Sequence, residues 1–223
     1  MRQHPKTLES ELSDEELRCL TEVLQKRRLS GNHLEIGTAA GGTLARMMNC
    51  YDEHTRPHFV VVDTMTYFEG QFEIVRRNLS EHGLNPDSVE FHTARSFDVF
   101  KQAEKAGERY EFIFIDGAHG CRYVMQDLSW SRLLRRGGVL CMHDYAPKTR
   151  GVIVAANRFL KKYKNYEKIA LAGSLLVIRK SDESPEPEVT LGDHIYATMM
   201  SLWLQLRNSI EKRINRIIRR NGR

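Results

Sequence analysis

The sequence predicts an α/β fold: a doubly wound, mostly parallel sheet of seven strands with helices on both faces. Short apolar runs such as residues 59–62 and 112–115 show no polar alternation, which is typical of parallel strands buried on both faces. Segments with helical periodicity separate these runs, as right-handed crossovers require. Acidic residues stand at or near the carboxyl ends of four runs, where doubly wound sheets bind their ligands. One such domain is the expectation for 223 residues.

The elements are expected in a regular alternation. An amphipathic helix over residues 14–28 comes first, capped by Ser13 or Asp14. Five strands follow, at residues 33–37, 58–63, 89–93, 111–116 and 138–143. The helices that alternate with them are predicted at residues 42–49, 70–82, 97–106, 122–134 and 152–162. Residues 168–179 are interpreted as two strands about a break at residues 172–174, and this hairpin puts an antiparallel strand at one edge of the sheet.

Four regions are predicted along the chain: an N-terminal helical segment, the α/β domain, a polar linker and a basic amphipathic helix, at residues 1–30, 31–180, 181–190 and 191–223. The last helix is expected to run from Asp193 to about Arg219. Its apolar residues recur at spacings of three and four, at Ile195, Met199, Leu202, Leu206, Ile210, Ile214 and Ile217.

Composition and cysteine usage predict a cytoplasmic protein. No apolar run approaches the ~20 residues that cross a bilayer, and residues 1–13 lack the apolar core of a signal peptide. The cysteines lack the close spacing of a metal site and are expected to be reduced, at Cys19, Cys50, Cys121 and Cys141.

The basic charge of the chain is confined to its last helix. The formal net charge is +5, whereas residues 203–223 hold seven Lys/Arg and one acid, Glu211, which gives +6 there and −1 over residues 1–202. A near-neutral body lacks the basic face that nucleic-acid binding needs, so no specific nucleic-acid partner is expected. The helix is instead expected to pack on the domain or on a second subunit, as a homodimer. A peripheral contact with the inner face of a membrane is the alternative.

A glycine-rich turn after the first strand predicts a nucleoside-bearing cofactor. Its pattern, Glu35-x-Gly37-x-x-x-Gly41, differs from the dinucleotide fingerprint G-x-G-x-x-G and places an acid two residues before the first glycine. An acid there suits a cationic ligand better than a pyrophosphate, and S-adenosylmethionine carries a sulfonium and an amino group but no phosphate. Asp63, at the end of the second strand, is placed to accept the ribose hydroxyls. An ordinary strand-to-helix turn and a turn cap at Asp63 are the structural alternatives.

A second acidic pair is expected on the same rim of the sheet. Asp116 ends a wholly apolar strand, and Asp144 ends the neighbouring strand, about 5 Å away. Both carboxylates can reach one divalent cation, and their hard oxygen ligands suit Mg²⁺. A metal there would bind a substrate hydroxyl and lower its pKa. In-line methyl transfer also depends on the alignment of that oxygen with the sulfonium.

Four segments together resemble the motif series of class I S-adenosylmethionine-dependent methyltransferases: HLEIGTAAGGT, VVVDT, FIFIDGAHGCRYVMQDLSW and RRGGVLCMHDY. The resemblance covers residues 30–180 and is greatest to the macrocin- and catechol-type O-methyltransferases. It implies a Rossmann-like methyltransferase fold and methylation of a hydroxyl on a small molecule or a saccharide. It also implies that the cofactor is bound by Glu35, Gly37, Thr38, Gly41, Asp63, Ser96 and Asp116.

The resemblance implies the reacting residues as well. Asp116 matches the first metal ligand of the catechol-type enzymes, and His119 stands where they place a lysine base, so His119 is expected to be the general base. His143 and Asp144 replace an Asp-Asn pair, which makes both expected metal ligands and admits Mn²⁺ beside Mg²⁺. His143 is also interpreted as a residue that orients a neighbour. Asp127 is expected to face solvent or to act as a strut.

Two other functions stay open at this stage. A nicotinamide-dependent oxidoreductase is disfavoured because the glycine spacing is wrong for pyrophosphate. A non-catalytic scaffold that binds the cofactor and is recruited through the C-terminal helix would need no acceptor. For His119 and His143 the alternative is a hydrogen-bonded structural role. For Asp144 the alternative is a cap of the following loop.

Overall fold

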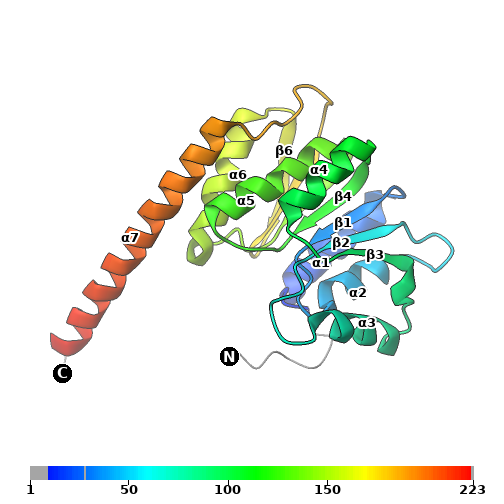
Figure 1. The fold of residues 1–223 in the computed structure, drawn as a ribbon, viewed down its shortest axis with the longest axis horizontal. Helices are drawn as coiled ribbons and strands as arrows, with labels where there is room; N and C mark the ends of the chain where they lie inside the picture. The colour runs from blue at the N-terminus through cyan, green and yellow to red at the C-terminus, as the bar shows by residue number, and fades with distance from the viewer. Residues whose placement is uncertain (1–9, 28, 222–223) are drawn as a thin grey trace.

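The sheet has seven strands, with helices on both of its faces (Figure 1). The computed structural model of the chain describes residues 10–27 and 29–221. The strands are β1 (His33–Ile36), β2 (Phe59–Val62), β3 (Val89–His92), β4 (Tyr110–Ile115), β5 (Leu134–Met142), β6 (Tyr166–Ala172) and β7 (Leu175–Lys180). Their order across the sheet is β3-β2-β1-β4-β5-β7-β6. The predicted doubly wound, mostly parallel fold is confirmed, and its antiparallel strand is β7, which lies between β5 and β6.

The helices lie close to their predicted positions. They are α1 (Asp14–Arg27), α2 (Gly42–Met48), α3 (Gln71–Glu81), α4 (Ser96–Ala106), α5 (Cys121–Asp127), α6 (Arg150–Lys162) and α7 (Leu191–Asn221), with short 3-10 helices η1 (Pro86–Ser88), η2 (Leu128–Leu133) and η3 (Pro147–Thr149). Arg28, the predicted last residue of the first helix, lies outside the described residues.

The helix predicted over residues 122–134 is shorter than expected. α5 ends at Asp127, and the chain continues as η2, in which the Ser131 hydroxyl donates to the carbonyl of Leu128 at 2.6 Å. A side chain that bonds its own backbone in this way competes with the regular helical pattern. β5 then begins at Leu134, four residues before the predicted start, with a register shift where it pairs with β4.

Two apolar cores lie on opposite faces of the sheet. Ile113 and Ile115 of β4 belong to the core beneath α4, α5 and α6, whereas Phe112 and Phe114 belong to the core beneath α1, α2 and α3. Alternate residues of a strand point to opposite faces, so a strand that is covered on both sides needs apolar residues at every position. This burial explains the unbroken apolar runs of the sequence.

The carboxyl ends of the central strands are in register. Ile36 of β1 pairs with Ile115 of β4, and Ile115 pairs with Met142 of β5. The ladder extends one residue further, because the amide of Asp116 donates to Ile36 at 2.8 Å and that of His143 donates to Ile115 at 3.0 Å. The residues that follow β1, β4 and β5 therefore form one rim of the sheet.

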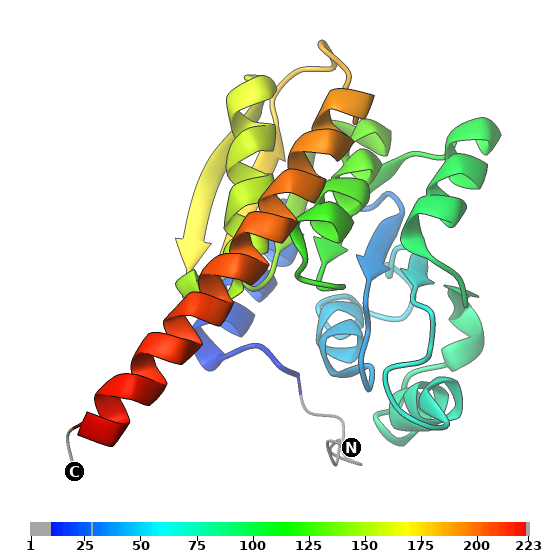
Figure 2. The ribbon, with the colours of Figure 1, turned by 60° about the vertical axis from the view of Figure 1, so that its left-hand side comes forward.

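α7 packs across the outside of α5 and α6, and its last turns extend past the domain (Figure 2). Its docked face includes Ala197, which is fully buried, and Leu204. Asp193 fixes its first turn by accepting from the Thr190 amide at 3.1 Å and from Lys162 at 2.7 Å. Among the helices of the described residues, none is long and apolar enough to span a membrane.

Candidate active site

The turn after β1 lies directly against the end of β4. Gly37 has φ +83°, and a Cβ at this position would stand 2.4 Å from the carbonyl oxygen of Asp116. Only glycine combines this left-handed backbone with so close an approach. Gly41, with φ +87°, then precedes the first residue of α2. The two glycines of the motif therefore shape the turn and set it against the neighbouring strand.

Side chains from β2 and α3 hold the same turn in place. The carboxylate of Asp63 accepts from the Thr38 amide at 2.9 Å and from the Met65 amide at 2.7 Å. Gln71 donates to the carbonyl of Ala39 at 3.0 Å. A carboxylate has about four acceptor sites, so Asp63 keeps the capacity to accept a ribose diol while it braces the turn.

Glu35 is fully buried beneath the turn. Neither of its carboxylate oxygens nor the buried hydroxyl of Thr38 has a hydrogen-bond partner of good geometry among the described residues. Burial raises the pKa of Glu35 to about 8, the neighbouring Thr38 moderates the shift, and the charges of Asp116 and Asp63 add to it. Buried polar groups are normally paired. A ligand with positive charge and N–H donors would satisfy Glu35, as the sulfonium and amino groups of S-adenosylmethionine would.

The hydroxyl of Ser96, at the start of α4, is already engaged. It accepts from Trp130 Nε1 at 2.8 Å and also hydrogen-bonds to Asp127. Because the indole can only donate, the Ser96 hydroxyl must donate to the Asp127 carboxyl. Asp127 is buried, and burial raises its pKa to about 7. Of the two roles expected for Asp127, facing solvent or acting as a strut, the structure bears out the strut, because the carboxyl lies buried beneath α4.

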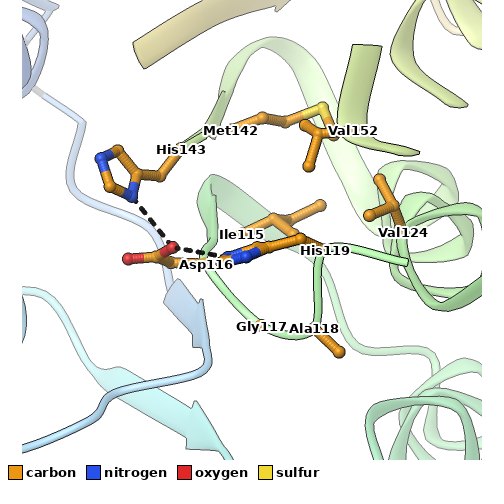
Figure 3. Close-up of a pocket in the computed structure, with 9 residues that line it drawn as sticks. All are labelled: Ile115, Asp116, Gly117, Ala118, His119, Val124, Met142, His143 and Val152. Carbon is orange, nitrogen blue, oxygen red and sulfur yellow. Dashed lines mark hydrogen bonds and ion pairs between the residues drawn. The ribbon is translucent and has the colours of Figure 1, made fainter. Parts of the chain in front are cut away.

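Two imidazoles and two carboxylates meet on the rim, and Figure 3 shows both imidazoles beside Asp116. His143 Nδ1 lies 3.0 Å from Asp116 Oδ1, and His119 Nε2 lies 3.8 Å from the same oxygen. His119 Nε2 also lies 3.0 Å from Asp144 Oδ2. A small pocket opens beside them, lined by Ile115, Asp116, Gly117, Ala118, His119, Val124, Met142, His143 and Val152.

Asp144 is held in an unusual backbone conformation. Its φ is +58°, in the left-handed region that aspartate tolerates better than most residues. The Thr149 hydroxyl donates to its carbonyl, and Lys148 Nζ lies 3.3 Å from its Oδ1. The carboxylate therefore lies between His119, which faces Oδ2, and Lys148, which faces Oδ1.

The carboxylates favour the protonated form of both imidazoles. The pKa of His119 is raised by the neighbouring carboxylates of Asp116, 3.8 Å from Nε2, and Asp144, 3.0 Å from it, although burial opposes the shift. Burial alone would lower the pKa of His143, but the hydrogen bond and charge of Asp116, with the charges of Asp144 and Glu16, raise it to about 8. His119 is half exposed, whereas His143 is buried.

Glu16 is a rim residue that the sequence analysis missed. It closes a capping box at the start of α1, accepting from the Ser13 amide at 2.8 Å. Its Oε1 accepts from the amide and the hydroxyl of Ser174, each at 2.7 Å. Its Oε2, which accepts from Ser13, also lies 3.6 Å from His143 Nε2. Burial opposes ionisation, but these hydrogen bonds outweigh it and lower the pKa of Glu16 to about 2. The pattern Ser-x-x-Glu signals the cap but not this reach across the fold.

The three predicted metal ligands come together. Asp116, His143 and Asp144 each offer a ligand atom, and these atoms all lie within 4.8 Å of one another. The two carboxylates match the oxygen ligands that Mg²⁺ and Mn²⁺ prefer. His143 fits less well, because both of its ring nitrogens already face carboxylates, those of Asp116 and Glu16.

Comparison with known proteins gives one family and many related folds. A family model described as a methyltransferase domain matches residues 34–145, just over half of the chain. No curated protein matches the chain. A Bacillus cereus O-methyltransferase in complex with S-adenosylhomocysteine is 20% identical, with 77% of this chain and 83% of that chain covered and a TM-score of 0.62.

Two further solved structures have similar values. The O-methyltransferase TomG of Streptomyces achromogenes, in complex with S-adenosylmethionine, is 18% identical, with 77% and 82% of the two chains covered and a TM-score of 0.59. CalS11, a TDP-rhamnose 3′-O-methyltransferase, is 18% identical, with 77% and 82% covered and a TM-score of 0.61. The oxidoreductase and scaffold alternatives are set aside by the family match. The chain belongs to the methyltransferase-domain family and is a class I S-adenosylmethionine-dependent methyltransferase.

Proposed function

We propose that the chain is an O-methyltransferase that acts on a hydroxyl of a small molecule or a saccharide. The observation that carries the proposal is the cluster of His119, Asp116 and Asp144 on the rim, near Asp63, which follows β2, and the buried Glu35 of β1. A base flanked by carboxylates suits removal of a hydroxyl proton. Solved proteins of the same fold are named O-methyltransferases, and one of them acts on a sugar nucleotide.

The cofactor would lie over the turn between β1 and α2. Its cationic end would meet the buried carboxyl of Glu35 and the hydroxyl of Thr38, which have no other partner of good geometry among the described residues. Gly37 and Gly41 would leave the backbone open to it, and Asp63 would accept the ribose diol. The backbone at Ser96 would border the adenine, because the Ser96 hydroxyl is engaged elsewhere. Asp116 would border the methionine end.

His119 would act as the general base. Its Nε2 faces Asp116 and Asp144 and must donate to them, so its Nδ1 is the basic nitrogen. In the transfer step Nδ1 takes the proton of the acceptor hydroxyl while the acceptor oxygen bonds to the methyl carbon. The carbon–sulfur bond breaks, and its electron pair stays on sulfur, which leaves S-adenosylhomocysteine. Asp144, 3.0 Å from Nε2, and Asp116 would hold the ring in place and stabilise the imidazolium that forms. His143 would keep Asp116 oriented through its 3.0 Å contact.

We propose that Asp116 and Asp144 also hold Mg²⁺ or Mn²⁺, with His143 as a weaker third ligand. Such an ion would supply Lewis acidity to the acceptor oxygen when bound. The two carboxylates are buried or nearly so, and their ligand atoms lie close enough for one ion after a small side-chain adjustment. Unchanged activity in excess EDTA would reject the ion and leave His119 as the base.

The variant His119→Gln tests the proposal. We expect transfer to an acceptor panel of aromatic and saccharide hydroxyls to fall by about 10²–10⁴-fold, the usual contribution of a general base. Calorimetric binding of S-adenosylhomocysteine should persist. His58→Gln is the matched control, because this half-exposed histidine also pairs with an acid but precedes β2 at the opposite end of the sheet. Full activity of His119→Gln would reject His119 as the base.

A homodimer and a cytoplasmic location remain sequence-based proposals.

Cys121 and Cys141 are buried free thiols, as the prediction of reduced cysteines requires.

A further inference from the structure

α7 has a second face that the domain leaves uncovered. The apolar residues predicted to pack are instead exposed, by 54% at Ile195, 64% at Met199, 62% at Leu202, 61% at Leu206 and 47% at Ile210. The side chains of Ile214 and Ile217, which continue the predicted series, lie outside the described residues. We call the five exposed residues the outer face of α7. It extends over about 22 Å of helix at 1.5 Å per residue.

The inner face carries the docking of α7. Asp193, Ala197 and Leu204 are buried, and Met200 packs against the core. Arg158 Nε donates to Asp193 at 2.8 Å. The helix packs on the domain, which was one of the predicted arrangements, but not through the apolar series that the sequence analysis identified. A different series, offset around the helix, makes that contact.

The direction of α7 places its last turns at the catalytic rim. Its first turn pairs with Arg158 and Lys162, late in α6, whereas Glu211 accepts from Arg150 at 3.0 Å, where α6 begins. α6 begins shortly after Asp144, at the carboxyl end of β5. The helical residues after Glu211 therefore add about 15 Å of helix beyond this point. Figures 1 and 2 show the last turns of α7 extending past the domain.

The charge of these turns identifies the partner. Residues 203–223 hold seven Lys/Arg and one acid, Glu211, which already pairs with Arg150 and Arg207. At seven-residue spacing the sequence continues Met199 and Leu206 with Arg213 and Arg220. A second copy of α7 in parallel register would bring these arginines together, which is unfavourable. Lipid phosphates would neutralise these arginines, and the apolar side chains of the outer face would insert at the boundary between headgroups and acyl chains.

We propose that α7 docks the enzyme on an anionic lipid surface through its outer face and its cationic last turns. Trp203, half exposed beside that face, suits the lipid–water boundary. The catalytic rim then lies next to the lipid headgroups. If the proposed function holds, the acceptor hydroxyl belongs to an amphiphilic molecule at that surface. Docking itself does not depend on methyl transfer.

Co-sedimentation of the full chain with vesicles tests the proposal. We expect binding to phosphatidylcholine vesicles that contain phosphatidylglycerol, no binding to phosphatidylcholine alone, and release by high salt. The double variant Leu202→Ser/Leu206→Ser should lose at least about tenfold in affinity. Arg213→Gln/Arg216→Gln should lose about 25-fold, because each cation contributes about fivefold. Leu171→Ser is the control, since Leu171 is 45% exposed on β6.

Sedimentation velocity and calorimetry complete the test. Every variant should bind S-adenosylhomocysteine as the unchanged chain does, which separates lost docking from lost folding or a wrong cofactor site. Equal binding of the unchanged chain and the Leu202→Ser/Leu206→Ser variant to anionic vesicles would overturn the proposal. So would a dimer that forms without vesicle binding and dissociates in that variant, because the outer face would then be an interface between copies.

Discussion

Replacement of Gly37 by alanine tests whether the β1 turn is built by close packing. A Cβ there would stand 2.4 Å from the Asp116 carbonyl, where real contacts are ordinarily 3.4 Å or more. The left-handed φ of +83° costs an alanine roughly 1 kcal/mol. Separation of the ends of β1 and β4 adds about 1–3 kcal/mol of overpacking strain. The free energy of unfolding should therefore fall by about 2–4 kcal/mol.

Gly107→Ala is the matched control for this prediction. Gly107 has φ +73°, but nothing lies within 4 Å of a Cβ added there. This variant should lose only about 1 kcal/mol. Urea unfolding followed by tryptophan fluorescence gives both values, and calorimetry should show weakened S-adenosylhomocysteine binding for Gly37→Ala alone. Equal destabilisation of the two variants would refute the close-packing account of the motif glycine.

Three further predictions concern titration and docking. Burial lowers the pKa of His33 to about 4, so the free energy of unfolding should fall by up to ~3 kcal/mol as pH drops from about 6.5 to 4. Urea unfolding at several pH values should show a weaker pH dependence for His33→Phe. Burial raises the pKa of Asp127 to about 7, so its carboxyl should lower stability as pH rises from about 4 to 7, opposite to the effect of His33. Asp127→Asn should lack this contribution. Asp193→Ala should release α7, seen as faster proteolysis of residues 181–190.

The fold was largely predictable because the residue pattern within each strand reports how that strand is buried. Strands buried on both faces need apolar residues throughout, so residues 59–62 and 112–115 were recognisable from the sequence. The rim followed, because parallel strands bring their carboxyl ends to one edge. The sequence alone therefore placed Asp116 and Asp144 together.

Other features depend on contacts between distant segments. Glu16 forms an ordinary capping box in sequence, and nothing local shows that Ser174 and His143 complete its environment. The sequence could not decide whether Asp127 faces solvent or acts as a strut, because its partner Ser96 comes from another helix. α7 carries two apolar series, and the domain selects the one with Ala197 because a small residue allows close helix packing.

A crystal structure with S-adenosylhomocysteine and Mn²⁺ would test the central claim most directly. We predict the ligand over the turn that begins at Gly37, with its ribose diol on Asp63 and its amino-acid end beside Glu35. The anomalous signal of the ion should lie between Asp116 and Asp144. A ligand bound away from this rim, or Asp116 and Asp144 turned away from the bound nucleoside, would contradict the account.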